Sequence, residues 1–558
     1  MSPIPREGEE AVEGPRVPRE EPAAPLDRAT EREMLGSLRA GTVRWEPTEE
    51  LWRLSVEPAQ WVWSSRTATE GLGHRLSTLF ADRTGDGPGG LRVHALFLGR
   101  GSSAGVHLSV GLDPLRPRLA SLVDPIPYVA PFEREAAESF GVEFEGARDR
   151  RPLRRPLRRH GARDPEPRPA VGDPPAGSPA VPADRFAAVE GEGVHEIAVG
   201  PVHAGVIEPG HFRFQVVGER ILRLEIRLGY THKGTERLLS GRPADLGTIW
   251  AESISGDMSL AGAMAYAQAV ERARGSVVAP ADDLARGLLL ELERTAFLLG
   301  DLAGIALDVG YAVGAARANG LREEAYRTLA RLTGSRLGRS ILAVGGLRRP
   351  LLPVPSDRVA ATLVGLGQRT RSWSEELLDK SSVLDRLEGT GTLPRWVAEL
   401  VPCVGPVARA SGLRRDLRAD RPYGPYRGIE VRVPRAREGD VKARFQVKVA
   451  EIEEACRLAG QFLEARDRAG TEGYPSAGPS VAVAAPSPTD GLGWVESPRG
   501  EFLVHVRLDP AGTVGRVHVR DPSFLNWPAL EWAVRGNIVP DFPLINKSFN
   551  LSYSGYDR

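Results

Sequence analysis

Cysteine is scarce in this chain of 558 residues, which has only Cys403 and Cys456. Two cysteines are too few for a disulfide framework, a zinc finger or an iron–sulfur cluster held by this chain alone. We interpret both as small buried hydrophobic residues. The sequence also lacks any run of roughly 18 apolar residues, the length that a membrane-spanning helix needs.

An excess of one charge is missing as well. The 73 basic and 73 acidic residues give a formal net charge of zero. Nucleic-acid-binding proteins usually carry a basic excess, so this balance argues against nucleic acid as a partner. The N-terminus has no apolar segment of the kind found in secretory signals, which favours a cytoplasmic location.

Composition separates folded from unfolded stretches. Residues 1–30 are rich in Pro and Glu and poor in large apolar residues, so we expect a disordered tail. A first folded domain is expected over 31–157, a Pro-rich linker over 158–185 and a second folded domain over 186–558. Within the second domain, 471–490 has the composition of a low-complexity insertion.

Apolar periodicity predicts individual elements. Strands are expected at 91–98 and 106–112, and hairpins at 212–228 and 501–520. The pattern predicts helices over 283–316 (one helix or a pair), 358–388 and 438–468. Generic catalytic motifs are absent: the ten histidines show no HExxH spacing, and there is no GxSxG elbow or dinucleotide-binding fingerprint.

Longer segments carry a family resemblance. Residues 130–145 read APFEREAAESFGVEFE and resemble the signature of the 30-kDa subunit of complex I. Residues 200–239 contain GPVHAGVIEPGHFRF and LGYTHKGTERLL. They are similar to the start of the 49-kDa subunit of complex I and of the large subunit of membrane-bound (group 4) NiFe hydrogenases. Further blocks follow in family order, among them ELERTAFLLGDLAGIALDVGY, VGPVARASG and RDPSFLNWPALEWAVRGNIVPDFPLINKS.

The two parts are fused in one chain, as in large subunits of the formate hydrogenlyase type. The resemblance covers about 35–155 and 190–558. It implies an α+β fold, with a small α/β domain of the 30-kDa type over 31–157. The second domain, 186–558, is expected to be mainly helical and hydrogenase-large-subunit-like, with small β-sheets.

The resemblance also identifies four metal-ligand positions that have lost their cysteines. In NiFe hydrogenases, two CxxC pairs hold the bimetallic centre through soft thiolates. The first pair falls on Ser255 and Met258, and the second on Ser552 and Gly555. A serine hydroxyl is a poor substitute for a thiolate, so we expect no nickel, no other metal and no NiFe hydrogenase activity.

In complex I, the vacated site binds quinone beside a His of the GPxH loop and a Tyr that precedes the AYxxAVE helix. His203 matches the histidine, whereas the tyrosine position falls near Gly256. Asp257 is a candidate replacement as proton donor, because a carboxyl group in a closed cavity can have a raised pKa. The alternative is that Asp257 caps the helix beginning near Met258.

Four further residues match family positions. Glu208 matches a carboxylate that relays protons in group 4 hydrogenases; the alternative is a surface loop acid. His211 is a weaker candidate for the same cavity, the alternative being a hydrogen-bonded core histidine. His232 and Arg237, in YTHKGTER, match a segment near the partner's cluster and would tune its potential. The alternative for this pair is a hydrogen-bonded network at a helix start.

Two charged features also allow structural interpretations. Residues 148–163 hold eight arginines and one acid, Asp149. They are either a docking strap on an anionic partner surface or the start of a solvated linker. Arg535 and Asp541 match residues that pair beside the metal site in the family, and we expect a buried structural pair.

The resemblance implies a peripheral subunit of a membrane-associated, NADH-quinone oxidoreductase-like complex, related to energy-converting hydrogenases, on the cytoplasmic side of the inner (cell) membrane. Electrons would come from [4Fe–4S] clusters on a small iron–sulfur subunit and pass to a quinone or another acceptor. A ferredoxin-like subunit and antiporter-like or quinone-channel membrane subunits are the other expected partners. Two alternatives remain: a non-catalytic coupling subunit, favoured by the missing tyrosine, and a true NiFe hydrogenase, which the cysteine count opposes.

Overall fold

The computed structural model describes residue 33 and residues 42–47, 49–84, 90–99, 104–153, 186–203, 207–469 and 489–558. The expected tail, the linker, the arginine run beyond 153 and most of the 471–490 insertion lie outside these residues. Helices and small sheets make up the described part, which confirms the α+β fold class. Strand β13 begins at Thr489, so the end of the expected insertion is a strand.

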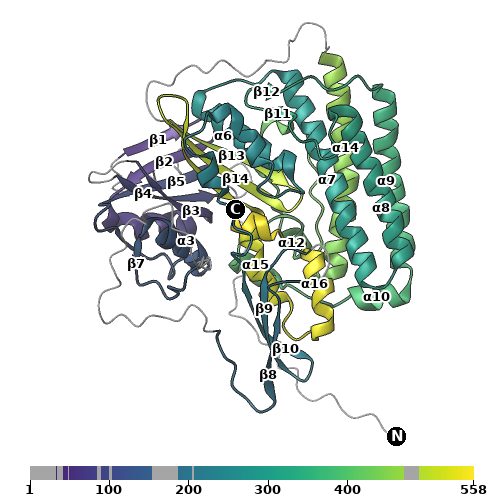
Figure 1. The fold of residues 1–558 in the computed structure, drawn as a ribbon, viewed down its shortest axis with the longest axis horizontal. Helices are drawn as coiled ribbons and strands as arrows, with labels where there is room; N and C mark the ends of the chain where they lie inside the picture. The colour runs from purple at the N-terminus through teal and green to yellow at the C-terminus, as the bar shows by residue number, and fades with distance from the viewer. Residues whose placement is uncertain are drawn as a thin grey trace, which may run out of the picture.

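The N-terminal domain is built on a five-stranded sheet in the order β1-β2-β5-β4-β3 (Figure 1). Its strands are β1 (Thr42–Glu46), β2 (Leu51–Val56), β3 (Arg75–Arg83), β4 (Leu91–Leu98) and β5 (Gly105–Leu112). β2 and β5 run parallel, and the other neighbours are antiparallel. Nearly every residue of β4 is buried, as is typical of a strand covered on both faces. β4 and β5 confirm the two predicted strands, and helix α3 (Ala130–Phe140) packs against β3.

Four long helices form the largest part of the C-terminal domain (Figure 1). They are α7 (Pro280–Asp308), α8 (Ala312–Thr333), α9 (Ser356–Leu378) and α14 (Val441–Ala469). α7 packs against both α8 and α14, and it is buried on most faces because leucine and alanine occupy nearly half of its positions. The segment predicted as one helix or a pair, 283–316, is therefore a pair. The chain turns between α7 and α8 at Gly310, whose backbone is in the left-handed conformation (φ +80°).

Two three-stranded sheets complete this domain. One comprises β8 (Val194–Val199), β9 (His211–Val217) and β10 (Arg220–Arg227), and it projects away from the long helices (Figure 1). The other comprises β13 (Thr489–Ser497), β14 (Gly500–Leu508) and β15 (Val514–Arg520), and it lies on helix α6 (Ser259–Arg274). Both predicted hairpins are confirmed. Gly491 and Gly493 permit the close approach, since a Cβ at either would collide with the backbone of α6.

The other described elements are short. The helices are α2 (Trp61–Arg66), α4 (Thr235–Leu239), α5 (Gly247–Ala251), α10 (Ser381–Leu387), α11 (Arg395–Leu400), α12 (Gly405–Ala410), α13 (Leu417–Asp420), α15 (Pro522–Ala533), α16 (Phe542–Phe549) and α17 (Tyr553–Asp557). Single turns of 3-10 or π-helix lie at Pro58–Gln60, Thr67–Gly71, Pro127–Val129, Ala244–Leu246, Gly424–Tyr426 and Val539–Asp541. The short strand pairs are β6 (Arg118–Ala120) with β7 (Glu143–Glu145), and β11 (Leu342–Ala343) with β12 (Gly346–Leu347). Across the described ranges, no helix has both the length and the hydropathy to cross a lipid bilayer.

The two domains meet through a buried cluster of imidazole rings. The ring nitrogens of His94 (β4) and His107 (β5) lie 3.1 Å apart. The ring of Phe80 stacks on His94 and on His518 of β15, with centroids 4.8 and 4.4 Å apart, and His505 of β14 completes the cluster. Burial lowers the pKa of His518 to about 4 and the pKa of His94 and His107 well below the usual value. These three imidazoles are therefore neutral at pH 7.

We expect His518→Gln to reduce the acid sensitivity of the folded chain. An unfolded imidazole takes up a proton near pH 6.5, whereas folded His518 does so only near pH 4. The free energy of unfolding is therefore unaffected by this group above pH 6.5 and falls by about 3 kcal/mol as the pH decreases to 4.

Urea unfolding of wild type and variant at pH 7 and pH 4 measures this difference. His195→Gln replaces an exposed imidazole and serves as the control. An identical pH dependence in wild type and His518→Gln would contradict the expectation.

Candidate functional site

The four former ligand positions come together where the segment before α6 meets α17. The hydroxyl of Ser255 lies 2.7 Å from the hydroxyl of Ser552 and 3.2 Å from a carboxylate oxygen of Asp521. The backbone N–H of Gly555 donates to Ser552 Oγ at 2.8 Å, and that of Met258 donates to the Ser255 carbonyl at 2.9 Å. All five residues are buried. The fold thus joins two serines that are 297 positions apart in the chain.

This donor set does not fit the NiFe centre of the hydrogenases that the chain resembles. Such a centre needs soft thiolate ligands, whereas the four positions offer two mutually hydrogen-bonded hydroxyls, one thioether and a glycine. A Cβ at Gly555 would lie 2.6 Å from Ser255 Oγ and would collide with the Asp521 carboxylate. No metal-dependent step is therefore assigned to this site.

Asp521 was not among the residues predicted from the sequence. Its side chain is fully buried, and it caps α15 by accepting the backbone N–H of Ser523 at 2.8 Å. Burial raises the pKa of this carboxyl group. The sequence signal was the Asp-Pro pair before an apolar helix, which is typical of a helix N-terminus.

Glu208 contacts this serine cluster from the β8–β9 loop. One of its carboxylate oxygens accepts the backbone N–H of Ser554 at 3.0 Å. The hydroxyl of Ser554 lies 3.4 Å from that of Ser552, which in turn contacts Ser255. Glu208, Ser554, Ser552, Ser255 and Asp521 therefore form one polar row, which runs from a half-buried loop acid to a buried carboxyl group.

The two loop histidines bond within their own loop. The Nε2 atom of His203 lies 2.8 Å from the carbonyl oxygen of Gly210, and its ring packs near Phe212 at 5.6 Å between centroids. The Nδ1 atom of His211 lies 3.4 Å from the carbonyl oxygen of Gly200. Because Gly210 is two residues after Glu208, His203 holds the end of the loop that presents Glu208.

Asp257 forms an ion pair that its local sequence does not reveal. Two guanidinium N–H groups of Arg499 donate to its carboxylate at 2.8 and 2.7 Å, and the Asp257 side chain keeps 44% of its exposure. Burial acts to raise the pKa of Asp257, but Arg499 outweighs it, so the pKa is lowered. The expectation of a raised pKa is wrong, because the positive partner comes from the distant β13–β14 turn.

Asp257 does not cap α6 either. The capping residue is Met258, and the backbone N–H groups of Leu260 and Ala261 donate to the buried carboxyl group of Glu293 at 2.7 and 2.9 Å. Burial raises the pKa of Glu293 to about 8. Sequence reasoning missed Glu293, although a second Glu within an apolar helix was a visible signal.

His232 lies beside the last residues of the chain. The Nδ1 atom of His232 is 2.7 Å from the carbonyl oxygen of Asp557, whose carboxylate accepts the backbone N–H groups of Gly229 and Thr231 at 2.7 and 2.8 Å. Arg237 lies on the exposed side of α4. The block before α4 therefore holds α17 in place, and the tuning of a partner's cluster stays a prediction.

The expected pair of Arg535 and Asp541 is wrong. Asp541 accepts a hydrogen bond from Arg386 at 3.0 Å. The guanidinium of Arg535 lies over the ring of Trp532, 3.9 Å from its centroid. Asp541 thus pairs with Arg386, and Arg535 stacks on Trp532, so the two residues do not pair with each other.

Two cavities lie between the domains, and neither is lined by Ser255, Met258, Ser552 or Gly555. The first has a volume of about 230 Å³ and is walled mainly by charged residues. The second has a volume of about 270 Å³, with Phe524, Trp527, Tyr556 and Glu531 in its wall. The indole N–H of Trp527 donates to the carbonyl oxygen of Ser552 at 3.3 Å, so this cavity borders the serine cluster.

Comparisons with known proteins agree with this architecture. The family model of the 30-kDa subunit of the respiratory-chain NADH dehydrogenase matches residues 54–165, and that of the 49-kDa subunit matches 308–476 and 480–558. Formate hydrogenlyase subunit 5 of Escherichia coli is 28% identical over 83% of this chain and 81% of its own length. An NADH-quinone oxidoreductase subunit of Roseiflexus castenholzii is 28% identical over 66% of this chain and 94% of its own length.

A solved structure has the same fold over a large part of the chain. It is a chain of the membrane-bound sulfane sulfur reductase, an archaeal respiratory membrane complex, with a TM-score of 0.59 and 26% identity. The match covers 65% of this chain and 98% of the solved chain.

The fold and these comparisons define a subunit of a complex I-like or group 4 hydrogenase-related membrane complex. More specifically, the chain joins a domain of the 30-kDa type and a domain of the 49-kDa type of the respiratory-chain NADH dehydrogenase in one sequence. This confirms the resemblance seen in the sequence.

We expect Gly555→Ala to destabilise the folded chain by about 2 kcal/mol, because an added methyl group overpacks a filled site. The new Cβ would press on Ser255 Oγ and on the Asp521 carboxylate. Thermal unfolding of the purified chain measures the loss.

Gly320→Ala is the matched control, because nothing lies within 4 Å of a Cβ at Gly320 in α8. This variant should keep or slightly raise the stability. If Gly555→Ala is as stable as Gly320→Ala, the former ligand site is not packed as described.

Proposed function

We propose that the chain serves proton-coupled electron transfer in a membrane-associated complex I-like oxidoreductase related to energy-converting hydrogenases. Electrons enter from a [4Fe–4S] cluster on a small partner subunit and leave on a quinone or another acceptor. The chain itself holds no nickel and no tightly bound cofactor. A ferredoxin-like subunit and antiporter-like or quinone-channel membrane subunits complete the assembly. The chain is peripheral, on the cytoplasmic side of the cell membrane.

The polar row from Glu208 to Asp521 carries this proposal. Reduction of a quinone to a quinol consumes two electrons and two protons, so an acceptor site needs proton donors within reach. Glu208 is the first donor, and His203 in the same loop is the second. Asp257 has no part in this proton supply, because Arg499 keeps its carboxylate ionised. The serine hydroxyls at the former ligand positions suit proton movement and not metal binding.

The second cavity supports an organic acceptor beside this row. Its wall combines the aromatic rings of Phe524, Trp527 and Tyr556 with the carboxyl group of Glu531, an arrangement typical of sites for small amphipathic molecules. Burial raises the pKa of Glu531 to about 7, so this group also carries a proton near neutral pH. Only the side chain of Trp527, which donates a hydrogen bond to the carbonyl oxygen of Ser552, lies between the cavity and this serine.

A second function is a coupling subunit without redox chemistry. The filled space at Gly555 favours it, because the former metal site has been closed by side chains instead of being left open. In that case, the chain would only brace the cluster subunit against the membrane subunits.

The test uses the complex purified from membranes through a tag on this chain. The iron–sulfur centres are reduced, and their EPR signals are followed after a short-chain quinone is added. We expect rapid reoxidation in the wild type. Glu208→Gln and His203→Ala should slow it by about 100-fold or more, because each removes a general acid.

Glu192→Gln changes an exposed acid in the turn before β8 and should leave the rate unchanged. Signals that stay reduced in the wild type would overturn the quinone proposal and favour the coupling subunit. Equal rates in wild type and Glu208→Gln would remove Glu208 from the proton path.

A further inference from the structure

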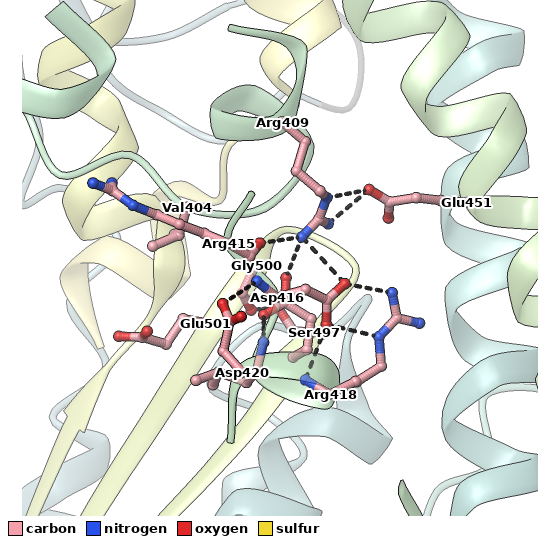
Figure 2. A network of polar contacts seen from close by, with 12 residues as sticks. Val404, Arg409, Arg415, Asp416, Arg418, Asp420, Glu451, Ser497, Gly500 and Glu501 are labelled. Carbon is pink, nitrogen blue, oxygen red and sulfur yellow. Dashed lines mark hydrogen bonds and ion pairs between the residues drawn. The ribbon is translucent and has the colours of Figure 1, made fainter. Parts of the chain in front are cut away.

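A second polar system lies away from the serine cluster, against the first cavity. Its centre is the guanidinium of Arg409 on α12, which is fully buried (Figure 2). Arg409 donates to Glu451 of α14 at 2.7 Å and to Glu496 of β13 at 2.9 Å. A third carboxylate, that of Asp416, lies 3.4 Å from the same guanidinium.

Two more buried guanidinium groups complete this network. Arg418 donates to Asp416 at 3.0 and 2.7 Å and to both carboxylate oxygens of Glu291 at 3.1 Å. Arg294 donates to Glu291 at 3.0 Å and lies 3.8 Å from Glu451. The network therefore joins helices α7, α12, α13 and α14 to strand β13.

The charges of this network do not balance. It contains three guanidinium groups and four carboxyl groups, namely Arg294, Arg409, Arg418, Glu291, Asp416, Glu451 and Glu496. All seven side chains are at most 2% exposed. If all four carboxyl groups were ionised, the network would hold one net negative charge, which is costly away from water. Binding of one proton makes this set of seven groups neutral.

Few contacts and a place in the wall of the first cavity distinguish Glu496 in this set. Among the described residues, Glu451 is also hydrogen-bonded to Arg409 alone, but it does not line that cavity. The Glu291 carboxylate accepts hydrogen bonds from Arg294, from Arg418 and from the hydroxyl of Tyr426. Glu496 receives a single guanidinium N–H, from Arg409, and the backbone N–H of Leu417 at 3.1 Å. Burial and the neighbouring Asp416 raise the pKa of Glu496 to about 7, while the pKa of Asp416 and that of Glu291 are lowered despite burial.

Three charged groups outside the network, two guanidinium groups and one carboxylate, carry one net positive charge. Arg75 and Arg520 both pair with Glu501, whose pKa falls to about 2 because these two guanidinium groups outweigh burial. Among the described groups near Glu496, Tyr423 accepts the backbone N–H of Glu496 at 2.9 Å and is a neutral phenol at pH 7, because burial raises its pKa. Asp420 has a pKa raised by burial and also faces the cavity.

The first cavity provides a route for protons. Glu496 and Asp416 belong to its wall, as do His74 and Tyr128 from the N-terminal domain. Its volume of about 230 Å³ holds several water molecules, given roughly 30 Å³ for each in the liquid. Water in this cavity can exchange a proton with the Glu496 carboxylate.

We propose that this network is a proton-binding site at the junction of the two domains, which takes up and releases one proton at the Glu496 carboxyl group through the adjoining cavity. On uptake, the proton passes from cavity water to a carboxylate oxygen and the network becomes neutral. On release, the network keeps one net negative charge. The site does not depend on the acceptor chemistry proposed above, and it operates whether or not the chain serves a quinone.

Infrared difference spectroscopy of the tagged complex, titrated between pH 5.5 and 8.5, tests this site. We expect the carbonyl band of a protonated carboxyl group to titrate with a midpoint near pH 7. Folded Glu496→Gln should lose this component. Burial also raises the pKa of Glu293 to about 8 and that of Glu531 to about 7, so the assignment rests on the difference between wild type and variant.

Glu501→Gln is the matched control, because this carboxyl group on the adjacent strand is ionised throughout the titration and contributes no band. Asp416→Asn provides an independent test, since loss of the neighbouring negative charge should lower the Glu496 midpoint by roughly one pH unit or more. An undiminished band in folded Glu496→Gln, or an unmoved midpoint in Asp416→Asn, would overturn the proposal.

Discussion

The guanidinium group of Arg558 holds the two domains and the candidate site in one arrangement. It pairs with Glu135 of α3 in the N-terminal domain and with Glu236 of α4 in the C-terminal domain, and it donates to the carbonyl oxygen of Val519. Burial opposes ionisation of Glu236, but Arg516, His518 and Arg558 keep its pKa well below the usual value. A buried charge with several partners fixes geometry better than an apolar contact, because its removal leaves the opposite charge unpaired.

This anchor positions the former ligand site. Asp557 binds the backbone before α4, so α17 lies against the segment that precedes α6 and brings Ser552 to Ser255. At this point the backbone closes around hydroxyl groups, with Ser255 and Ser552 hydrogen-bonded at 2.7 Å. Asp521 then takes the space left by Gly555. The packing of the site therefore follows from the substituted side chains and needs no change of fold.

Sequence reasoning predicted local structure and family well, because both depend on patterns within short segments. Two strands of the N-terminal sheet, β4 and β5, and both hairpins were visible in the apolar pattern, and the family blocks placed Ser255 and Ser552 at one site. It failed where a charge finds its partner far along the chain. Arg499 is 242 positions from Asp257, and Arg386 is 155 from Asp541, so no local pattern could reveal either pair or its effect on a pKa.

The β13–β14 turn connects the two polar systems of the molecule. Glu496 precedes this turn and belongs to the buried network, whereas Arg499 within it holds Asp257 beside α6. The turn packs against the start of α12 so closely that a Cβ at Gly500 would lie 2.6 Å from the backbone nitrogen of Gly405. It therefore has little room to adjust. Glu496 thus lies at one end of a tightly packed turn, and Arg499 within the turn fixes the carboxylate of Asp257.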